Sequence, residues 1–472
     1  MRKNLKKYYL KLYVLFIFLF IVFNNLSLAQ SIRQQIDAYL KVYDEMDCFS
    51  GTVLVAKNDS IIFHQAYGMA NYELKVPNTT QTVYHIASLT KPITAALVMQ
   101  LVESGKIKFD AKIYDYLPDF NTKSGKMITI HQLLNHTSGL PHYESVHDFS
   151  TNISRLPYSH KEFLKFISEL NLLFEPGTHF KYSSFGYYVL GAIIEKVTNT
   201  SYEKILKEKI LQPAGMKNTE ADDQRNLIMH RANGYDYDHD GLLNTHYRDM
   251  STAFAAGNLC STTEDLFLFV KALFKKKLFN QATLKTMLNK YPPGFSYGWF
   301  SGTSNNNFNY KEYDYYYHTG GINGFSSILS HYDDETTIII LGNFSFILRE
   351  KIERDIYAIV NGGKYIIPKI KKQIKPDTKI FHDYIGKYEI DSLKHIRISG
   401  SKSGLYYETP DSLKYILIPF SNNEFYIKEK NIVINFRINS TDSSASLELY
   451  ESDKLIFRAV KSGTQKSTKS ID

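Results

Sequence analysis

The spacing of apolar residues changes near residue 364, and this change most restricts the folds open to the chain. Before it, some stretches, such as Ser31–Met46, repeat apolar residues at helical spacing, and others, such as Gly51–Ala56, are short apolar runs. After it, short alternating stretches follow one another at nearly regular intervals. The 472 residues therefore predict two domains, a mixed α/β domain followed by a small all-β sandwich or barrel.

Strands are predicted at both ends of the first region, with helices at its start, middle and end. This order favours a sheet packed with helices, into which a helical portion is inserted. The predicted strands are Gly51–Ala56, Ile61–Tyr67, Tyr313–His318, Phe325–Tyr332 and Thr336–Leu341, and the predicted helices are Ser31–Met46, Ser88–Ser104, Ile128–Leu134, Leu190–Val197 and Phe346–Val360.

The second region is predicted to span residues 380–462, after a linker with Lys and Pro at residues 364–379. Residues 463–472 are polar and are predicted to be disordered. The predicted strands of the second region are Tyr384–Ile390, His395–Ile398, Leu405–Glu408, Tyr415–Ile418, Glu424–Ile427, Ile432–Phe436, Leu447–Tyr450 and Leu455–Val460.

The N-terminus has the composition of a secretory signal peptide. Five basic residues and no acid occupy positions 1–11, an apolar run spans Leu12–Phe23, and small residues precede Gln30. We therefore predict a signal peptide over residues 1–29 and export to the periplasm or the extracellular space. The alternative is an uncleaved N-terminal membrane anchor, which would be the protein's one membrane contact.

Net charge, cysteine content and one calcium-like loop were also considered as indicators of function. Without the five N-terminal basic residues, 51 basic and 48 acidic residues remain, a net charge of +3 that gives no basis for nucleic-acid binding. Cys48 and Cys260 could pair in an exported protein, but their apolar or small neighbours favour two buried free thiols. Asp236–Gly241 begins like a calcium loop, yet Tyr247 stands where the bidentate Glu should be, so a polar hairpin is favoured.

Ser88 and Lys91 lie three residues apart at the start of the helix predicted over Ser88–Ser104. Residues at this spacing share one helix face, so the lysine amine can reach the serine hydroxyl. A serine needs an adjacent base to act as a nucleophile, and a lysine can be that base if burial lowers its pKa. By itself the segment is equally compatible with a core helix that a serine caps.

Two other segments supply groups that such a nucleophile needs. Tyr182 precedes Ser183, Ser184 and a predicted helix, and a phenol near a Lys–Ser pair can deliver a proton to a leaving group. His318–Gly321 ends an aromatic strand, where glycines let a backbone N–H come close to a ligand. Taken alone, the first segment is also compatible with a buried Tyr beside an N-capping serine, and the second with a strand that ends in a turn.

Together these segments resemble the serine β-lactamase and penicillin-binding protein superfamily. They are most similar to class C β-lactamases, D-alanyl-D-alanine carboxypeptidases, D-aminopeptidases and related esterases. Three further segments resemble patterns of this group: Leu133–Leu140, Phe174–Gly177 and Gly257–Thr262. The resemblance implies an α/β (α+β) domain over residues 30–363, with an antiparallel sheet flanked by helices and a helical subdomain. The second region resembles a lipocalin-like module.

The resemblance also implies roles for individual residues. Ser88 matches the acylated nucleophile, Lys91 the general base or its proton partner, and Tyr182 the tyrosine that aids acylation and activates water. The backbone N–H groups of Ser88 and Gly321 match the two donors of the oxyanion hole.

Two positions of the implied substrate site depart from the family pattern. In His318-Thr319-Gly320, histidine replaces the lysine of the Lys-Thr-Gly element, and a histidine is only partly charged at neutral pH. Ser184 stands where penicillin-recognising members have asparagine, and its hydroxyl is shorter than a carboxamide. Efficient β-lactam hydrolysis is therefore not expected.

We accordingly predict an exported serine hydrolase that forms an acyl-enzyme on Ser88, without a metal or an organic cofactor. Its substrate would be a small molecule or peptide with an ester, amide or lactam carbonyl, and an esterase or D-amino-acid peptidase is favoured. The alternatives are a catalytically weak penicillin-binding or sensor protein of the same fold, and a true β-lactamase.

Overall fold

The computed structural model describes residues 31–462, apart from residues 121, 276, 293, 307–310, 370–371, 376, 392–393, 402–403, 411–412, 431, 440–444 and 452–453. The predicted signal peptide and the polar tail lie outside the described residues. Within the described part of the chain, no helix has both the length and the hydropathy needed to cross a membrane.

A seven-stranded antiparallel sheet forms the centre of the first domain, counted over the described residues. Its strands are β1 (Gly51–Lys57), β2 (Ser60–Tyr67), β10 (Phe295–Ser296), β11 (Trp299–Asn306), β12 (Lys311–Ile322), β13 (Phe325–Tyr332) and β14 (Thr336–Gly342). They lie in the order β10-β11-β12-β13-β14-β1-β2, so the two earliest strands extend a sheet built mostly from later residues. The register places Gly51 of β1 opposite Gly342 of β14.

Helices cover both faces of this sheet, which explains why β1, β13 and β14 are almost entirely buried. On one face, residues 31–45 and α12 (Arg349–Val360) pack against side chains such as Val53. On the other face, α2 (Thr90–Glu103) and α10 (Thr263–Phe274) pack against side chains such as Leu54. Because neighbouring residues of a strand point to opposite faces, each strand contributes to two cores.

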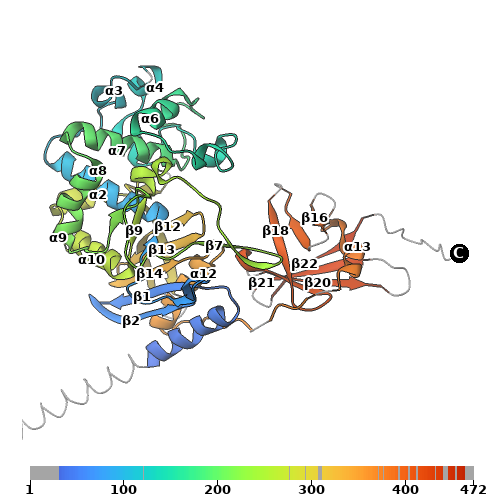
Figure 1. Ribbon diagram of the computed structural model, residues 1–472. Helices are drawn as coiled ribbons and strands as arrows, with labels where there is room; N and C mark the ends of the chain where they lie inside the picture. Colours follow the sequence, from blue (N-terminus) through green and yellow to red (C-terminus); the bar gives the residue numbers. More distant parts are fainter. Residues whose placement is uncertain are drawn as a thin grey trace, which may run out of the picture.

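A helical subdomain is inserted between β5 and the last strands of the sheet. Its α3, α4 and α6 gather beyond α7, at one end of the domain (Figure 1). Reciprocal caps begin two of these helices, Thr129 with Gln132 and Ser159 with Glu162. Its helices and those that follow are α3 (Ile113–Tyr116), α4 (Thr122–Met127), α5 (Ile130–Leu134), α6 (His160–Glu169), α7 (Ser184–Thr198), α8 (Tyr202–Leu206), α9 (Gln212–Ala214) and α11 (Gln281–Met287).

Short strands complete the first domain. A small sheet in the order β5-β9-β6 joins the segment before Ser88 to the segment after Gly257. A hairpin of β7 and β8 forms where the polar hairpin was predicted. The short strands are β3 (Met69–Asn71), β4 (Val76–Pro77), β5 (Tyr84–His85), β6 (Glu220–Ala221), β7 (Tyr235–Asp238), β8 (Gly241–Asn244) and β9 (Leu259–Ser261).

The C-terminal region is a closed antiparallel barrel, in which β15 pairs with both β16 and β22. The short helix α13 (Phe381–Tyr384) precedes it. Its strands are β15 (Gly386–Glu389), β16 (His395–Gly400), β17 (Leu405–Glu408), β18 (Lys414–Pro419), β19 (Glu424–Ile427), β20 (Ile432–Ile438), β21 (Ala445–Glu451) and β22 (Lys454–Lys461). Of the two predicted architectures, the sandwich is therefore wrong and the barrel is confirmed.

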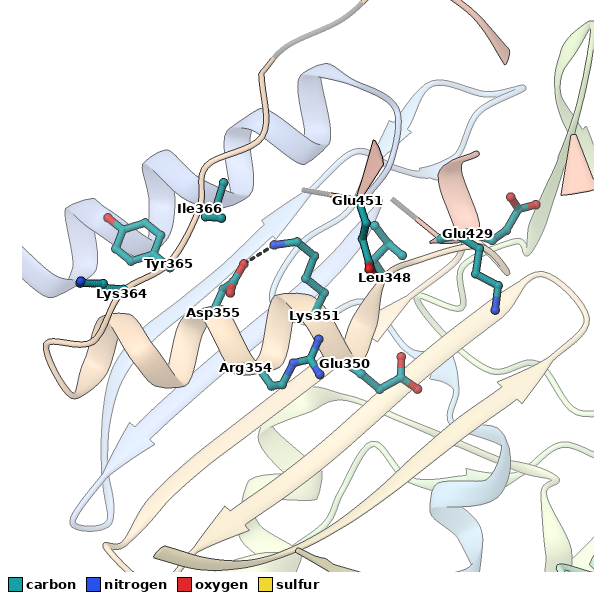
Figure 2. A pocket seen from close by; sticks show the side chains of 11 residues that line it. Leu348, Glu350, Lys351, Arg354, Asp355, Lys364, Tyr365, Ile366, Glu429 and Glu451 are labelled. Carbon is teal, nitrogen blue, oxygen red and sulfur yellow. Dashed lines mark hydrogen bonds and ion pairs between the residues drawn. The ribbon is translucent and has the colours of Figure 1, made fainter. Parts of the chain in front are cut away.

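The barrel lies against the side of the first domain from which the β7–β8 hairpin projects (Figure 1). Lys428 donates a hydrogen bond to the Asp47 carbonyl at 3.0 Å and lies 3.9 Å from the ring centre of Tyr237. A polar pocket of about 400 Å³ runs beside α12, where Lys351 and Asp355 form an ion pair (Figure 2). Apolar packing adds to these contacts, because Tyr426, Phe420 and Val433 of the barrel lie in one buried cluster with residues of the first domain such as Phe346.

Candidate active site

Ser88 and Lys91 are brought into direct contact where two helical segments join. Ser88 lies in a 3-10 turn over Ala87–Leu89, and α2 begins at Thr90, so the helix predicted to start at Ser88 begins two residues later. The Lys91 Nζ atom is 2.9 Å from Ser88 Oγ and donates a hydrogen bond to the Ala256 carbonyl at 2.8 Å. Ser88 is half-buried and Lys91 is fully buried. A ligand can thus reach the hydroxyl but not the amine.

The backbone before Ser88 is strained and is held from two sides. Ala87 has a φ of 50°, in the left-handed region that a residue with a Cβ atom rarely adopts. The Ile86 carbonyl accepts a hydrogen bond from Ser327 Oγ, and the Ile86 N–H donates one to the Leu259 carbonyl. A Cβ atom at Gly320 would lie 2.4 Å from the Ile86 carbonyl oxygen, so only glycine lets β12 approach this turn.

Burial favours the neutral form of the Lys91 amine. The pKa of its amine lies well below the usual value because burial disfavours the charged form and because Arg248 adds a second positive charge nearby. The neutral amine has a lone pair that can accept the Ser88 proton. The sequence-based expectation of a lysine with a lowered pKa therefore has a structural cause.

Tyr182 lies beside this pair, as the sequence comparison implied. The Lys91 Nζ atom is 5.0 Å from its ring centre, and the His136 ring lies 4.4 Å away on another side. The Tyr182 hydroxyl is buried without a hydrogen-bond partner in the described structure. Burial raises the pKa of the phenol, and the nearby Ser88 hydroxyl opposes part of that rise. The phenol is therefore protonated at neutral pH and can donate.

The segment after Tyr182 is positioned by helix capping. Ser183 is the N-cap of α7, and its Oγ atom accepts a hydrogen bond from the Gly186 N–H. Its own N–H donates to His136 Nδ1 at 3.1 Å. Ser184 is only 2% exposed, and its N–H donates to His142 Nδ1. Because the residue is almost fully buried, a contact between Ser184 and a substrate stays a prediction.

His318 is uncharged rather than partly charged, which corrects the sequence-based expectation. Burial, with the nearby Lys91 as the next largest cause, lowers its pKa to about 3. Its Nδ1 atom hydrogen-bonds to the Thr319 carbonyl at 2.6 Å, and its Nε2 atom has no partner among the described residues. Thr319 is half-buried and Gly321 is exposed, so the backbone of Gly321 is accessible.

Sequence reasoning missed two residues near Lys91, Arg248 and His142. The Arg248 guanidinium carbon lies 4.5 Å from the ring centre of Tyr143, which stacks on His142. Burial, with Lys91 and then Arg248 nearby, lowers the pKa of His142 to about 3. No motif marks Arg248, because 157 positions separate it from Lys91 in the chain and only the fold brings the two charges near each other.

The residues His85, Asp222 and Cys260 form a group of potential metal ligands. Asp222 already accepts a hydrogen bond from Arg231 at 2.7 Å and contacts His85 Nε2 at 3.2 Å. The Cys260 Sγ atom is 3.4 Å from the other ring nitrogen of His85. A cation would have to displace Arg231, so we interpret the group as a hydrogen-bond network. Cys48 and Cys260 are both free and buried, as favoured from the sequence.

Comparison with known proteins places the chain in a family. A family model described as Beta-lactamase matches residues 33–355. Penicillin-binding protein 4* of Bacillus subtilis (strain 168) is 28% identical over 454 residues, covering 90% of this chain and 98% of its own length. Teichoic acid D-alanine hydrolase of Staphylococcus aureus (strain NCTC 8325 / PS 47) is 29% identical over 283 residues, covering 58% of this chain and 67% of its own.

One similar solved structure extends the comparison through the barrel. The octameric penicillin-binding protein homologue from Pyrococcus abyssi has a TM-score of 0.63 and 21% identity, and the match covers 91% of this chain and 99% of that one. At this identity the likeness shows the fold alone. Both domains of the chain therefore have a counterpart of known structure.

Proposed function

The chain belongs to the Beta-lactamase family, and on that premise we propose that it is an exported enzyme that forms an acyl-enzyme on Ser88 and cleaves an ester or amide bond. The chain is a serine hydrolase related to β-lactamases. The observation that carries the finer proposal is the 2.9 Å contact between Ser88 Oγ and a buried lysine whose pKa is lowered.

In the proposed reaction, Ser88, Lys91 and Tyr182 act one after another. The Lys91 amine takes the Ser88 proton as Ser88 Oγ bonds to the substrate carbonyl carbon, and the N–H groups of Ser88 and Gly321 stabilise the oxyanion. Collapse of this intermediate breaks the bond to the leaving group, which takes a proton from Tyr182. The proton held by Lys91 restores the phenol, and a water molecule then hydrolyses the acyl-enzyme by the same route.

An ester or amide substrate is favoured over a β-lactam. Ser184 replaces the asparagine of penicillin-recognising members, and His318 is uncharged and cannot pair with a β-lactam carboxylate. One relative is named a teichoic acid D-alanine hydrolase, and one similar structure is a D-amino acid amidase. A catalytically weak penicillin-binding protein and a true β-lactamase are the competing outcomes.

The nucleophile is tested by labelling with a fluorophosphonate and reading the intact mass. We expect one adduct on the wild-type protein and none on Ser88→Ala. Ser145→Ala, which changes an exposed serine, should label like the wild type. Folded wild-type protein without an adduct would exclude the acyl-enzyme and favour the binding or sensor alternative.

The substrate class is tested by side-by-side turnover of a short-chain p-nitrophenyl ester, a D-alanyl-D-alanine peptide and nitrocefin. We expect the ester or the peptide to be hydrolysed fastest. Rapid nitrocefin hydrolysis would instead identify a β-lactamase.

Export is the remaining part of the proposal. It rests on the composition of residues 1–29, which lie outside the described structure. N-terminal sequencing of the protein recovered from cells should begin at Gln30 or close to it. A protein that retains residues 1–29 and sediments with membranes would support the uncleaved anchor.

A further inference from the structure

His136 is a fully buried histidine with a strained backbone, and the proposed reaction does not use it. It lies two residues after the end of α5 at Leu134. Its φ is 60°, in the left-handed region that a residue with a Cβ atom rarely adopts. Strain of this kind persists only where the surrounding structure imposes it, and it gathers at functional sites. The contacts that hold His136 therefore indicate what the strained residue does.

Two backbone hydrogen bonds join His136 to the residues on either side of Tyr182. The Lys181 N–H donates to the His136 carbonyl at 3.0 Å. The Ser183 N–H donates to His136 Nδ1 at 3.1 Å. Tyr182 lies between these two donors, so the chain is held on both sides of it. The two bonds together fix the direction in which the Tyr182 side chain leaves the backbone.

The imidazole of His136 also restrains the ring of Tyr182. The two ring centres are 4.4 Å apart, with an angle of 35° between the planes. The rings of Tyr187 and Phe295 lie 5.2 Å and 4.6 Å from the imidazole, and the Tyr187 hydroxyl is itself bonded to the Leu134 carbonyl. These neighbours keep the imidazole in place. One residue thus restrains both the backbone and the ring of the proposed acid.

The bond from Ser183 fixes the protonation state of His136. A backbone N–H only donates, so Nδ1 carries a lone pair and the hydrogen of the neutral ring lies on Nε2. Burial lowers the pKa of His136 well below the usual value, with Lys91, then His318 and His142, as further causes. A proton on Nδ1 would break the bond from Ser183. His136 therefore acts as a neutral acceptor.

Two other histidines lie near the ring of Tyr182 but contact it differently. His142 Nδ1 accepts the N–H of Ser184, two residues after Tyr182, at 3.2 Å. The ring centres of His142 and His318 are 5.3 Å and 5.9 Å from that of Tyr182. The bonds of His136 flank Tyr182 directly, and its ring is nearer. His136 is therefore the histidine best placed to control Tyr182.

We propose that His136 is a positioning residue, which aims the Tyr182 phenol at the leaving group by holding the backbone on both sides of Tyr182 and packing against its ring. The inference rests on the proposed hydrolase activity and deepens it by naming the residue on which the acid depends. His136 acts through Tyr182 and not on the substrate. A purely structural role would instead change the amount of folded protein and affect all substrates alike.

The first test compares phenyl butyrate with p-nitrophenyl butyrate, which share an acyl group. Phenolate is the poorer leaving group and depends more on a proton from Tyr182. Tyr182→Phe should therefore lower kcat/KM more for the phenyl ester. His136→Phe keeps a ring but loses the acceptor, and it should lower the phenyl-ester value at least about tenfold, as expected for a misplaced catalytic group. An equal fall for both esters would overturn the proposal.

His136→Asn is the conservative variant for this test. Asparagine tolerates a left-handed backbone, and its Oδ1 atom can accept the Ser183 N–H in place of Nδ1. It should recover part of the phenyl-ester activity lost in His136→Phe. A value below that of His136→Phe would overturn the role of the Ser183 bond.

His131→Phe is the matched control. It changes a half-buried histidine of α5 whose Nδ1 atom hydrogen-bonds with the Tyr297 hydroxyl at 2.6 Å. The substitution removes this bond, so the melting temperature should fall. The ratio of the two kcat/KM values should stay within about twofold of the wild type, a change of under 1 kcal/mol in the barrier. A ratio changed as much as in His136→Phe would overturn the proposal, because any buried histidine would then have the same effect.

The second test asks whether His136 acts through Tyr182. In Tyr182→Phe protein, the further change His136→Phe should lower kcat/KM for the phenyl ester by less than about twofold, because no acid is left to position. A further loss as large as in the wild-type background would overturn the proposal, since independent effects multiply.

The third test reads the His136 bond without enzyme turnover. In ¹⁵N NMR of the histidine-labelled protein, the signals that disappear in His136→Phe should show a protonated Nε2 and a bare Nδ1 between about pH 5 and pH 8. A protonated Nδ1 at neutral pH would overturn the proposal even if Ser88 is labelled by the fluorophosphonate. Absence of that adduct on folded wild-type protein would instead reject the hydrolase itself, with the tautomer of His136 unchanged.

Discussion

The proposed active site and the interior of the barrel are both buried, yet they are built from different residues. The barrel encloses apolar and aromatic side chains, among them Tyr388, Phe425 and Leu447. The proposed active site encloses Lys91 and His318, and several of its polar atoms have no partner among the described residues. Unpaired buried polar groups oppose folding, so their concentration in one region indicates that this region is shaped for chemistry. The barrel interior shows the packing expected from stability alone.

The contrast between the proposed active site and the barrel interior is tested most strongly by removing the Tyr182 hydroxyl, an unpaired polar group of the site. Tyr182→Phe should lower kcat by about 10²–10⁴-fold, the usual contribution of a general acid or base. The melting temperature should change little, because the hydroxyl makes no hydrogen bond within the described structure.

Tyr187→Phe is the matched control for that variant. The Tyr187 hydroxyl donates to the Leu134 carbonyl at 2.9 Å, so its loss should reduce stability by ~0.5–1.5 kcal/mol and leave kcat nearly unchanged. The opposite outcome, a stable and inactive Tyr187→Phe, would show that the chemistry is not centred on Tyr182.

The pH profile tests whether burial makes Lys91 a base. The amine is neutral above its pKa, which is lowered in the folded protein. The kcat/KM for a neutral ester should therefore be high at neutral and mildly alkaline pH. It should fall about tenfold per pH unit once the pH drops below that pKa.

Arg248→Gln should move this acid limb to higher pH, because one positive neighbour of Lys91 is lost. A profile with its limb near pH 10.5, the ordinary pKa of lysine, would contradict the idea that the amine is tuned by its surroundings.

A substitution in the barrel interior should instead lower stability and leave activity nearly unchanged. Leu447→Ala should destabilise the barrel by about 2–5 kcal/mol, because it leaves a cavity among packed side chains. Ester turnover by the folded protein should stay within about twofold of the wild type, a change of under 1 kcal/mol. Denaturant unfolding and kinetics on the same samples measure both effects. Leu455→Ala, on the outside of the barrel, is the control.

The smallest effect is expected at the junction of the two domains. Lys428→Met should remove the hydrogen bond to Asp47 and the contact with the Tyr237 ring, at a cost of about 1 kcal/mol in docking. Faster proteolysis within residues 364–379, at unchanged kcat, would agree with this. A large loss of activity would mean that the barrel contributes to catalysis, and the contrast drawn between the two regions would not hold.

Local sequence patterns were enough to predict much of the fold. The strands Phe325–Tyr332, Leu405–Glu408 and Glu424–Ile427 have the predicted bounds, because aromatic and branched residues between turn residues favour a strand. The family and the enzyme class inferred by resemblance are also confirmed. The start of α2 was misplaced by two residues, since the left-handed φ of Ala87 depends on contacts with distant strands.

By itself the sequence determined which residues could react: Ser88 and Lys91 meet because three positions along a helical turn bring them together whatever surrounds them. Only the tertiary structure decided how they would behave. The lowered pKa of Lys91 and the uncharged state of His318 both follow from burial and from charges contributed by distant segments. The physical reason is that a pKa depends on everything within several ångströms of the group, and that surrounding is assembled only when the chain folds.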